Sequence, residues 1–248
     1  MQNILITGAS SGLGLFLTRY FNNINYDLTT IGKDKIKLKK LKLTLKKKNV
    51  KNCYALDLNN EKNLKKFLKN LRGKKFDAVI HCIGGGFGKH NPLIEKKDLN
   101  FLFNLNVGVL AAINKEVVEK KLFAKNLKLI HISSVAAVEA TASVGYSMVK
   151  ASLISYTKIL SKYLINKKIF VHCILPGAFE YENNSFERLK IRNKKIYKEF
   201  ISKKLPRKKI ANAKNMLGLF KLLVSDEGNI LTGSPIIADY SETNSFRL

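Results

Sequence analysis

Residues 4–14 read Ile-Leu-Ile-Thr-Gly-Ala-Ser-Ser-Gly-Leu-Gly, an apolar run followed by a glycine-rich turn. The apolar residues are typical of a short buried strand, and the pattern from Gly12 to about Phe21 predicts a helix. Glycines at such a junction let the backbone turn tightly and approach a pyrophosphate, whose negative charge is favoured at a helix N-terminus. We therefore predict a dinucleotide-binding turn, and the alternative is a tight turn that holds no ligand.

Strand-like and helix-like segments continue to alternate along most of the chain. Besides residues 4–7, buried strands are expected at residues 28–31, 53–56, 78–82, 129–132 and 171–175. Strands that alternate with helices predict a parallel sheet covered on both faces. No Pro- or Gly-rich linker divides the chain. We therefore predict an α/β fold with a Rossmann-like, doubly wound parallel sheet in three α/β/α layers, forming one domain over residues 1–248.

Composition and cysteine usage argue against several classes of protein. No segment reaches the ~18 consecutive apolar residues of a membrane span, and the N-terminus lacks a signal-peptide pattern. We expect a cytoplasmic protein without a membrane span. Cys53, Cys82 and Cys173 are widely separated and form no Cys-x-x-Cys, which argues against a disulfide framework or a zinc site. The four histidines show no ligand spacing either, so we expect no metal.

The formal net charge of +27 has two interpretations. Basic surfaces attract nucleic acid or anionic membranes. The excess can also be compositional drift, because the chain is rich in lysine, asparagine and isoleucine, and aromatic residues are not interleaved with the lysines as a stacking platform requires. We favour drift over nucleic-acid binding, with attraction of anionic cofactors and substrates as a side effect.

Tyr146 and Lys150 occur four residues apart in a helix-like segment. Side chains at this spacing lie on the same face of a helix. A cation beside a phenol favours the phenolate, so we expect the pKa of Tyr146 to fall toward the operating pH, where a general acid or base works best. The alternative for the pair alone is a solvated helix face.

These motifs together resemble the short-chain dehydrogenase/reductase family over nearly the whole chain. The matching positions are the Thr-Gly-x-x-x-Gly-x-Gly loop at Thr7 to Gly14, the acidic-apolar pair Asp57-Leu58, the tetrad Asn106, Ser134, Tyr146 and Lys150, and the turn Pro176-Gly177. The resemblance implies an oxidoreductase that interconverts a carbonyl and a secondary alcohol by hydride transfer.

The resemblance also implies a role for each member of the tetrad. Tyr146 would protonate the carbonyl oxygen, and Lys150 would lower the pKa of Tyr146 and bind the nicotinamide ribose. Ser134 would hold the substrate oxygen where charge develops, with Ser133 as the rival for this role. Asn106 would anchor a water beside Lys150, and helix capping is the alternative for this residue.

The cofactor contacts implied by the family follow the same motifs. They are Thr7, Gly8, Ser10, Ser11, Gly12, Leu13, Gly14, Lys33, Asp57, Leu58, Cys82, Ile83, Gly84, Tyr146, Lys150, Pro176 and Gly177. At the end of the second strand, Gly32 stands where an NAD-preferring site places a carboxylate, and Lys33 can meet a 2′-phosphate. We favour NADP(H); NAD(H) stays possible because Asp34 is close.

Three segments depart from the family pattern. They are His81 to Gly84, which changes the surroundings of the adenosine, the Glu180-Tyr181 region after Pro-Gly, and Ala238 to Ser241, which lacks the usual Asp-Gly-Gly. We expect His81 to be a core residue or to support the site from behind. Residues 176–211 form a polar excursion with a helix near 185–202. We interpret this excursion as a substrate lid, and the alternative is a solvated helical excursion with no such role.

Several functions stay open for such an enzyme. The segment after Pro176 resembles relatives encoded with sugar-nucleotide or surface-polysaccharide pathways, which suggests such a precursor as substrate. The alternatives are a 3-oxoacyl-carrier-protein reductase-like enzyme and a non-catalytic NADP-binding regulator or scaffold. Family members usually form homodimers or homotetramers through the helices that contain Asn106 and Tyr146, and we expect the same.

Overall fold

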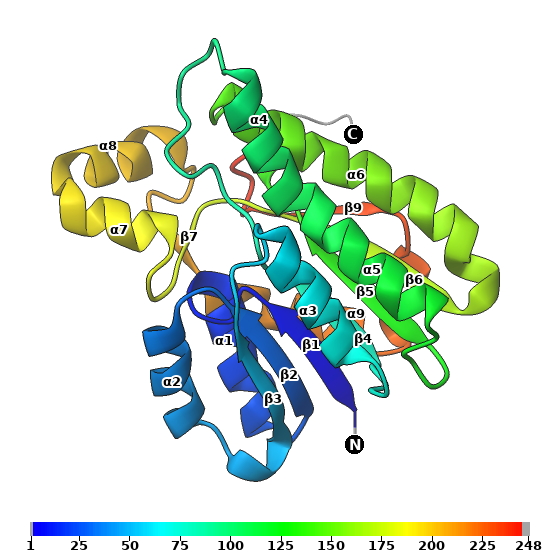
Figure 1. The fold of residues 1–248 in the computed structure, drawn as a ribbon. Coiled ribbons are helices and arrows are strands. Elements are labelled where there is room, and N and C mark those ends of the chain that lie inside the picture. Colours follow the sequence, from blue (N-terminus) through cyan, green and yellow to red (C-terminus); the bar gives the residue numbers. More distant parts are fainter. Residues whose placement is uncertain (1, 245–248) are drawn as a thin grey trace.

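The protein is described by a computed structural model in which residues 2–244 are placed (Figure 1). Within these residues seven parallel strands form one sheet in the order β3-β2-β1-β4-β5-β6-β9. The strands are β1 (Asn3–Thr7), β2 (Asp27–Gly32), β3 (Val50–Ala55), β4 (Ala78–His81), β5 (Leu127–Ile132), β6 (Ile169–Pro176) and β9 (Pro235–Ala238). The order reverses between β1 and β4, and ligands of such sheets bind outside the carboxyl ends of the strands at this switch point.

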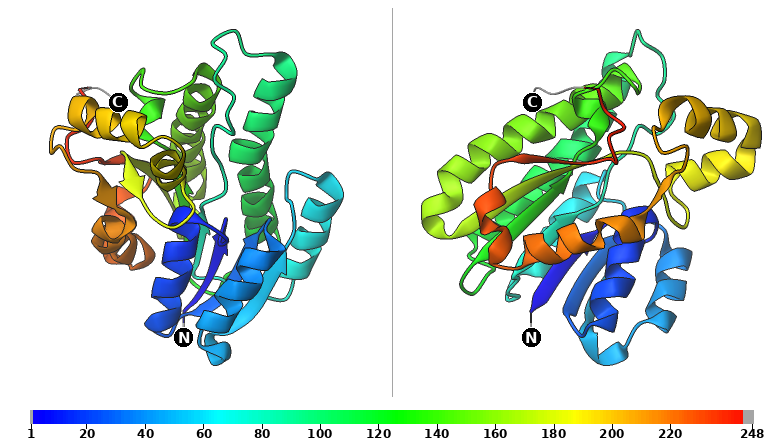
Figure 2. Two further views of the ribbon diagram at one scale, coloured as in Figure 1. Left: turned by 90° about the vertical axis from the view of Figure 1, so that its left-hand side faces the viewer. Right: turned by 180° about the vertical axis from the view of Figure 1, so that it is seen from behind.

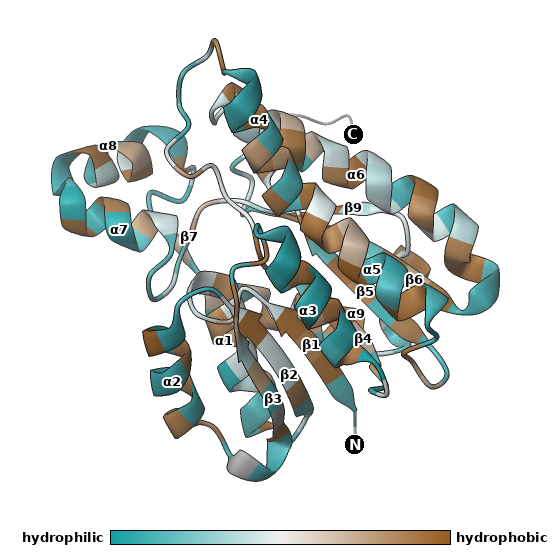
Figure 3. Ribbon diagram, viewed as in Figure 1, coloured by the Kyte–Doolittle hydropathy of each residue, from teal (hydrophilic) through white to brown (hydrophobic). Residues whose placement is uncertain are grey.

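Helices cover both faces of the sheet, as predicted. One face carries α1 (Gly12–Asn23), α2 (Lys35–Thr44) and α9 (Leu217–Val224), and the other carries α3 (Glu61–Leu71), α4 (Lys96–Phe103), α5 (Val109–Glu119) and α6 (Val144–Leu164). Side chains alternate between the faces along each strand. Ile4 and Ile6 pack with α1 and α9, and Leu5 packs with α3 and α5. Figure 3 shows apolar strands between helices whose outer surfaces are polar.

The helix that contains Asn106 is interrupted by a π-helical turn at Asn104–Gly108, between α4 and α5. Such turns are frequent at functional sites. The whole stretch Lys96–Glu119 is long and apolar enough to cross a membrane by length and composition alone. In this fold Val109, Ile113 and Val117 are buried against the sheet. We therefore assign the stretch to the core of the domain.

The excursion after β6 differs from the predicted single helix. Two helices, α7 (Ser185–Arg192) and α8 (Lys194–Lys204), stand to one side of the sheet above the start of α1 (Figure 2). Asn193 breaks the helix because its backbone leaves the helical region, at φ −149° and ψ 86°, and its side chain caps α8. The short strands β7 (Phe179–Glu180) and β8 (Ala211–Asn212) pair with each other at the base of the excursion.

Short 3₁₀ turns complete the chain: η1 (Lys47–Asn49), η3 (Val135–Ala137), η4 (Ile165–Lys167), η5 (Ala213–Met216) and η6 (Glu227–Leu231). Helix α2 ends at Thr44. Leu45 adopts extended backbone angles and is buried, so the chain leaves the helix to pack this side chain.

Candidate active site

The glycine-rich turn after β1 packs its backbone directly against the end of β4. A Cβ on Gly8 would lie 2.7 Å from the carbonyl oxygen of Cys82, and a Cβ on Gly14 would lie 2.4 Å from the carbonyl oxygen of Gly8. The Thr7 hydroxyl accepts hydrogen bonds from the amides of Cys82 and Ile83, at 3.1 and 3.3 Å. Larger residues cannot occupy the two glycine positions, so the turn keeps the close-packed form that a bound pyrophosphate requires.

The N-terminus of α1 lies under the excursion that follows β6. Ser11 is the N-cap residue, and Leu13 is buried in the first turn. Gly12 has φ +52°, and its amide donates to the carbonyl oxygen of Glu182 at 2.8 Å. Arg19, further along α1, forms an ion pair with Glu182 at 2.5 Å. The excursion is therefore fastened to the helix that we expect to bind the pyrophosphate.

The residues expected around the adenosine meet at the ends of β2 and β3. Lys33 Nζ lies 2.8 Å from the carboxylate of Asp57. Burial alone would raise the pKa of Asp57, but the bonds from Lys33 and the Asn59 amide lower it overall. Asp34 instead caps α2, accepting from the Lys37 amide at 2.9 Å. Leu58 is buried beside this pair.

Gly32 touches the glycine-rich turn. A Cβ at this position would lie 2.9 Å from the Ser10 hydroxyl oxygen. A carboxylate-bearing residue at position 32 would therefore have to displace Ser10. The sequence showed only that the carboxylate is missing at position 32, and the packing gives a steric reason.

Tyr146 and Lys150 lie one turn apart at the start of α6. The Lys150 ammonium is 5.6 Å from the centre of the Tyr146 ring and donates to the carbonyl oxygen of Ile132 at 2.8 Å. Burial lowers the pKa of Lys150 to about 8. Burial raises the pKa of Tyr146, and a hydrogen bond with the Ser134 hydroxyl lowers it by less. The predicted fall in the pKa of Tyr146 is therefore wrong for this structure, because desolvation disfavours the phenolate more than its neighbours stabilise it.

The two candidate serines lie in different surroundings. Ser133 is buried, and its hydroxyl donates to the carbonyl oxygen of Lys150 at 2.7 Å. Ser134 is half-buried, interacts with the Tyr146 phenol, and accepts from the Ala136 amide at 3.2 Å. Only Ser134 of the two thus presents its hydroxyl beside the phenol.

Asn106 holds the loop after β4 with its side chain. Its Oδ1 accepts from the Gly85 amide at 2.9 Å, and its Nδ2 donates to the carbonyl oxygens of Gly85 at 3.1 Å and Leu102 at 2.9 Å. A Cβ on Gly84 would lie 2.5 Å from Asn106 Oδ1 and 3.1 Å from Lys150 Nζ. The structure thus brings Asn106, Gly84 and Lys150 into one cluster.

Residues 8–240 match the family model described as enoyl-(acyl carrier protein) reductase. The chain belongs to the short-chain dehydrogenase/reductase family. The 3-oxoacyl-[acyl-carrier-protein] reductase of Rickettsia felis is 26% identical over 235 residues, which cover 94% of this chain and 92% of that protein. Dehydrogenase/reductase SDR family member 6 of Rattus norvegicus is 29% identical over 193 residues, 75% of this chain and 76% of that protein.

Solved structures show the same fold. L-sorbose reductase from Gluconobacter frateurii, in complex with NADPH and L-sorbose, superimposes with a TM-score of 0.87 at 21% identity, covering 98% of this chain and 97% of that chain. The short-chain dehydrogenase/reductase described here is therefore an NAD(P)-dependent oxidoreductase with a Rossmann-like fold.

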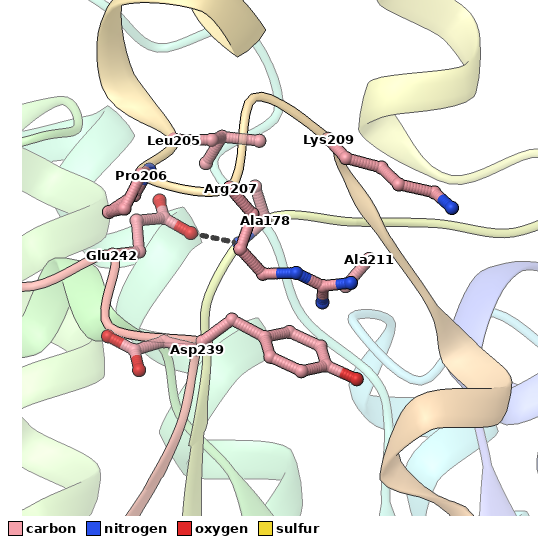
Figure 4. Close-up of a pocket in the computed structure, with 9 residues that line it drawn as sticks. Ala178, Leu205, Pro206, Arg207, Lys209, Ala211, Asp239 and Glu242 are labelled. Atoms are coloured by element: carbon pink, nitrogen blue, oxygen red, sulfur yellow. Dashed lines mark hydrogen bonds between the residues drawn. The ribbon is translucent and has the colours of Figure 1, made fainter.

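The Pro176-Gly177 turn of this short-chain dehydrogenase/reductase is held by residues that sequence reasoning missed. The Gly177 amide donates to the carbonyl oxygen of Ala238 at 3.1 Å, and the Ala178 amide donates to the Glu242 carboxylate at 2.6 Å (Figure 4). The only signal in the sequence is the departure from Asp-Gly-Gly after Ala238.

Behind the site, buried polar side chains form a chain of hydrogen bonds. His81 bonds Asn114 at 2.8 Å, Asn114 bonds His131 at 3.0 Å, and His131 bonds the Thr157 hydroxyl at 2.8 Å. Burial lowers the pKa of His81 to about 4 and that of His131 well below its ordinary value. The expected core role of His81 agrees with this arrangement, which ties β4 and β5 to α5 and α6.

The positive charge of the short-chain dehydrogenase/reductase is concentrated in two segments. Residues 33–75 contain 17 Lys+Arg against 3 Asp+Glu, and residues 185–209 contain 11 against 2. The first segment includes α2 and the second includes α7 and α8, which lie on the same side of the molecule (Figure 1). Positive charge therefore flanks the region between the excursion and the ends of β2 and β3.

Proposed function

We propose that the protein is an NADP(H)-dependent carbonyl reductase that converts a ketone into a secondary alcohol. The observation that carries this proposal is the cluster of the Tyr146 phenol, the Ser134 hydroxyl and the Lys150 ammonium beside the backbone of Gly84. These groups supply a proton donor, a hydrogen-bond donor and a cation at one point, which reduction of a carbonyl requires.

Each side chain has a distinct part in this reaction. The nicotinamide cofactor supplies the hydride when bound. Tyr146 holds the proton on its phenolic oxygen and passes it to the substrate oxygen as negative charge develops there. Ser134 donates a hydrogen bond to that same oxygen. Lys150 stabilises the phenolate that remains and binds the nicotinamide ribose, and Asn106 keeps the Gly84–Gly85 backbone in the position that borders the cofactor.

The adenosine end supports NADP(H) as the cofactor. An NAD-preferring site needs a free carboxylate at the end of β2. Gly32 has no room for a side chain, and Asp34 is engaged as the cap of α2. Lys33 is the exposed cation at this position, and its side chain can turn from Asp57 to a 2′-phosphate.

Two substrate classes remain for this site. The likeness to 3-oxoacyl-[acyl-carrier-protein] reductase covers 94% of the chain and favours a 3-oxoacyl thioester. The segment after Pro176 motivated a sugar nucleotide. In the structure Tyr181 packs on Phe16, and Glu182 pairs with Arg19, so neither side chain is free for a sugar. We therefore place the thioester first and propose the excursion at residues 176–211 as the lid over this substrate.

A substrate panel tests the proposal directly. Purified protein is incubated with NADPH and with acetoacetyl-CoA, a nucleotide-linked 4-keto sugar or L-sorbose, and NADPH consumption is followed together with product mass. We expect NADPH-dependent formation of the alcohol from acetoacetyl-CoA. Turnover of only the keto sugar would reassign the substrate. NADPH binding without turnover of any ketone would leave the non-catalytic regulator or scaffold.

Location and assembly follow from the same assignment. We infer a cytoplasmic enzyme, since Lys96–Glu119 packs in the core. We also infer a homodimer or homotetramer through α4, α5 and α6. Exposed apolar side chains along α6, namely Met148, Ile159 and Tyr163, give this surface its partner-binding character.

A further inference from the structure

We propose that Glu242 is a positioning residue for the reaction, because its carboxylate fixes the backbone of the Pro176-Gly177 turn at Ala178, the next residue. This inference rests on the proposed reductase function and on the expectation that Pro176 and Gly177 contact the cofactor. Glu242 lies in residues 239–244, the last segment that the structure describes, directly after β9. We refer to this segment as the C-terminal clamp.

The clamp contacts Gly177 and Ala178. Glu242 Oε2 accepts from the Ala178 amide at 2.6 Å, and Figure 4 shows the carboxylate pointing at this nitrogen. A Cβ on Gly177 would lie 2.5 Å from the same oxygen and 2.7 Å from the Cβ of Asp239. Only glycine fits under the clamp, so the turn and the carboxylate are matched in shape.

The backbone of the clamp is strained where it delivers the carboxylate. Tyr240 and Ser241 have φ values of +55° and +61°. A left-handed backbone is unfavourable for a residue with a side chain because Cβ approaches the following carbonyl oxygen. Asp239 offsets part of this cost, because its carboxylate accepts from the amides of Ser241 at 2.9 Å and Thr243 at 2.8 Å. Strain that the surroundings maintain in this way is concentrated at functional sites.

The clamp also joins two other parts of the active-site rim. The Asn244 amide donates to Glu139 Oε1 at 2.8 Å, and Glu139 lies just beyond the η3 turn that Ser134 begins. The Arg207 guanidinium lies 3.8 Å from the centre of the Tyr240 ring and ties the end of the 176–211 excursion to the clamp. The clamp therefore contacts the loop after Ser134, the end of the 176–211 excursion and the Pro-Gly turn.

The turn requires an acceptor oxygen and does not require a negative charge. An amide oxygen at the same place can accept from Ala178, whereas a side chain without oxygen leaves the N–H of this buried residue without a partner and releases the turn. Glu242→Gln therefore separates the hydrogen bond from the charge. Glu242→Met keeps the length of the side chain without the oxygen, and Glu242→Ala removes both.

The test compares these variants with Glu227→Ala, an exposed carboxylate at the opposite end of the sheet, as the matched control. NADPH affinity is measured by fluorescence titration, and kcat and KM are measured with acetoacetyl-CoA or with the ketone from the panel that wild type turns over. We expect Glu242→Ala and Glu242→Met to lower kcat about 10- to 100-fold, as misplacement by an ångström does. NADPH affinity should change by less than about 3-fold, since the pyrophosphate turn is intact. Glu242→Gln should retain most of kcat.

The outcomes separate this inference from the proposed function. Unchanged kcat in the alanine and methionine variants would overturn it, and so would a loss of kcat in Glu242→Gln as large as in Glu242→Met. If Glu242→Ala does not fold, the comparison of glutamine with methionine decides. A wild-type protein that binds no NADPH and reduces no ketone would overturn the proposed function and this inference together.

Discussion

Lys150 forms hydrogen bonds with Ile132, the last residue of β5, and with Ser133, the residue after it. Its ammonium donates to the carbonyl oxygen of Ile132 at 2.8 Å, and its own carbonyl oxygen accepts from the Ser133 hydroxyl at 2.7 Å. These two bonds fix α6 against the end of β5. They therefore fix Tyr146, one turn earlier, relative to Ser134.

Tyr146→Phe removes the proposed proton donor and little else. We expect kcat for ketone reduction to fall about 10²- to 10⁴-fold, the usual contribution of a general acid. NADPH affinity and the unfolding midpoint should stay close to wild type, because the ring is retained. NADPH oxidation measures kcat, and thermal melting measures the unfolding midpoint. Tyr20→Phe on α1 is the control, and retention of activity in Tyr146→Phe would refute the assignment of the proton donor.

The pH dependence should show Lys150 losing its charge. Burial lowers the pKa of Lys150 to about 8, and an amine is charged below its pKa. The rate of ketone reduction should therefore fall as pH rises through about 8. An arginine keeps its charge far above this pH. The Lys150→Arg variant should therefore reduce the ketone more slowly, but its rate should not fall as pH rises through about 8. A fall at the same pH in both proteins would assign it to another group.

Lys33→Ala tests the choice of cofactor. Lys33 is exposed and forms an ion pair with Asp57. If it meets the 2′-phosphate, its removal should weaken NADPH relative to NADH by about tenfold, of the order expected for one charge-assisted bond. Fluorescence titration with both cofactors gives this ratio. Lys35→Ala, at the neighbouring exposed position, should leave the ratio unchanged, and an unchanged ratio in Lys33→Ala would contradict the NADP assignment.

Three buried histidines should make the fold sensitive to acid. Burial lowers the pKa of His81 and His172 to about 4 and that of His131 well below its ordinary value. The unfolded chain then binds more protons below pH 6.5, so stability is full above this pH and is lost as pH falls toward 4. Each histidine contributes roughly 1.4 kcal/mol per pH unit in this window.

Urea unfolding between pH 5 and 8 measures this dependence. His172→Leu removes one of the three titrating groups. It should reduce the slope of the unfolding free energy against pH by roughly 1.4 kcal/mol per pH unit, the contribution of one proton. His90→Gln, at an exposed position, should leave the slope as in wild type. An identical slope in His172→Leu would show that this histidine does not contribute.

The surface of α6 should carry the subunit contact. Met148, Ile159 and Tyr163 expose 47%, 67% and 71% of their surface along one stripe of the helix. Burying such a side chain stabilises an interface by roughly 1.5–3 kcal/mol. Ile159→Lys should therefore shift the protein toward monomer in light scattering coupled to size exclusion. Ile36→Lys on α2 should not, and a monomeric wild type would refute the assembly.

The sequence predicted the parts of this protein that depend on local patterns. Strands such as β1 were predicted because Ile4, Leu5 and Ile6 are uniformly apolar, as a strand covered on both faces requires. Tyr146 and Lys150 were predicted to be neighbours because a helix repeats every 3.6 residues. The break at Asn193 was missed, since one polar residue inside a polar helix gives no change of period.

The adjacent serines show where local patterns end. The resemblance placed Ser134 in the tetrad and kept Ser133 as its rival, because both carry the same hydroxyl. The fold directs Ser133 to the carbonyl oxygen of Lys150 and Ser134 to the Tyr146 phenol. The pKa of Tyr146 was predicted in the wrong direction for the same reason. Its value depends on burial, which is a property of everything packed around the phenol.

The sequence alone determined the family, the parallel sheet and the residue types available for hydride transfer, because these follow from motifs of a few residues and from hydrophobic periodicity. Only the tertiary structure decided which serine faces the phenol, why Gly32 excludes a side chain, and how Glu242 reaches Ala178. These contacts join residues that are 12 to 64 positions apart in the sequence. Their geometry is set by the packing of the whole core.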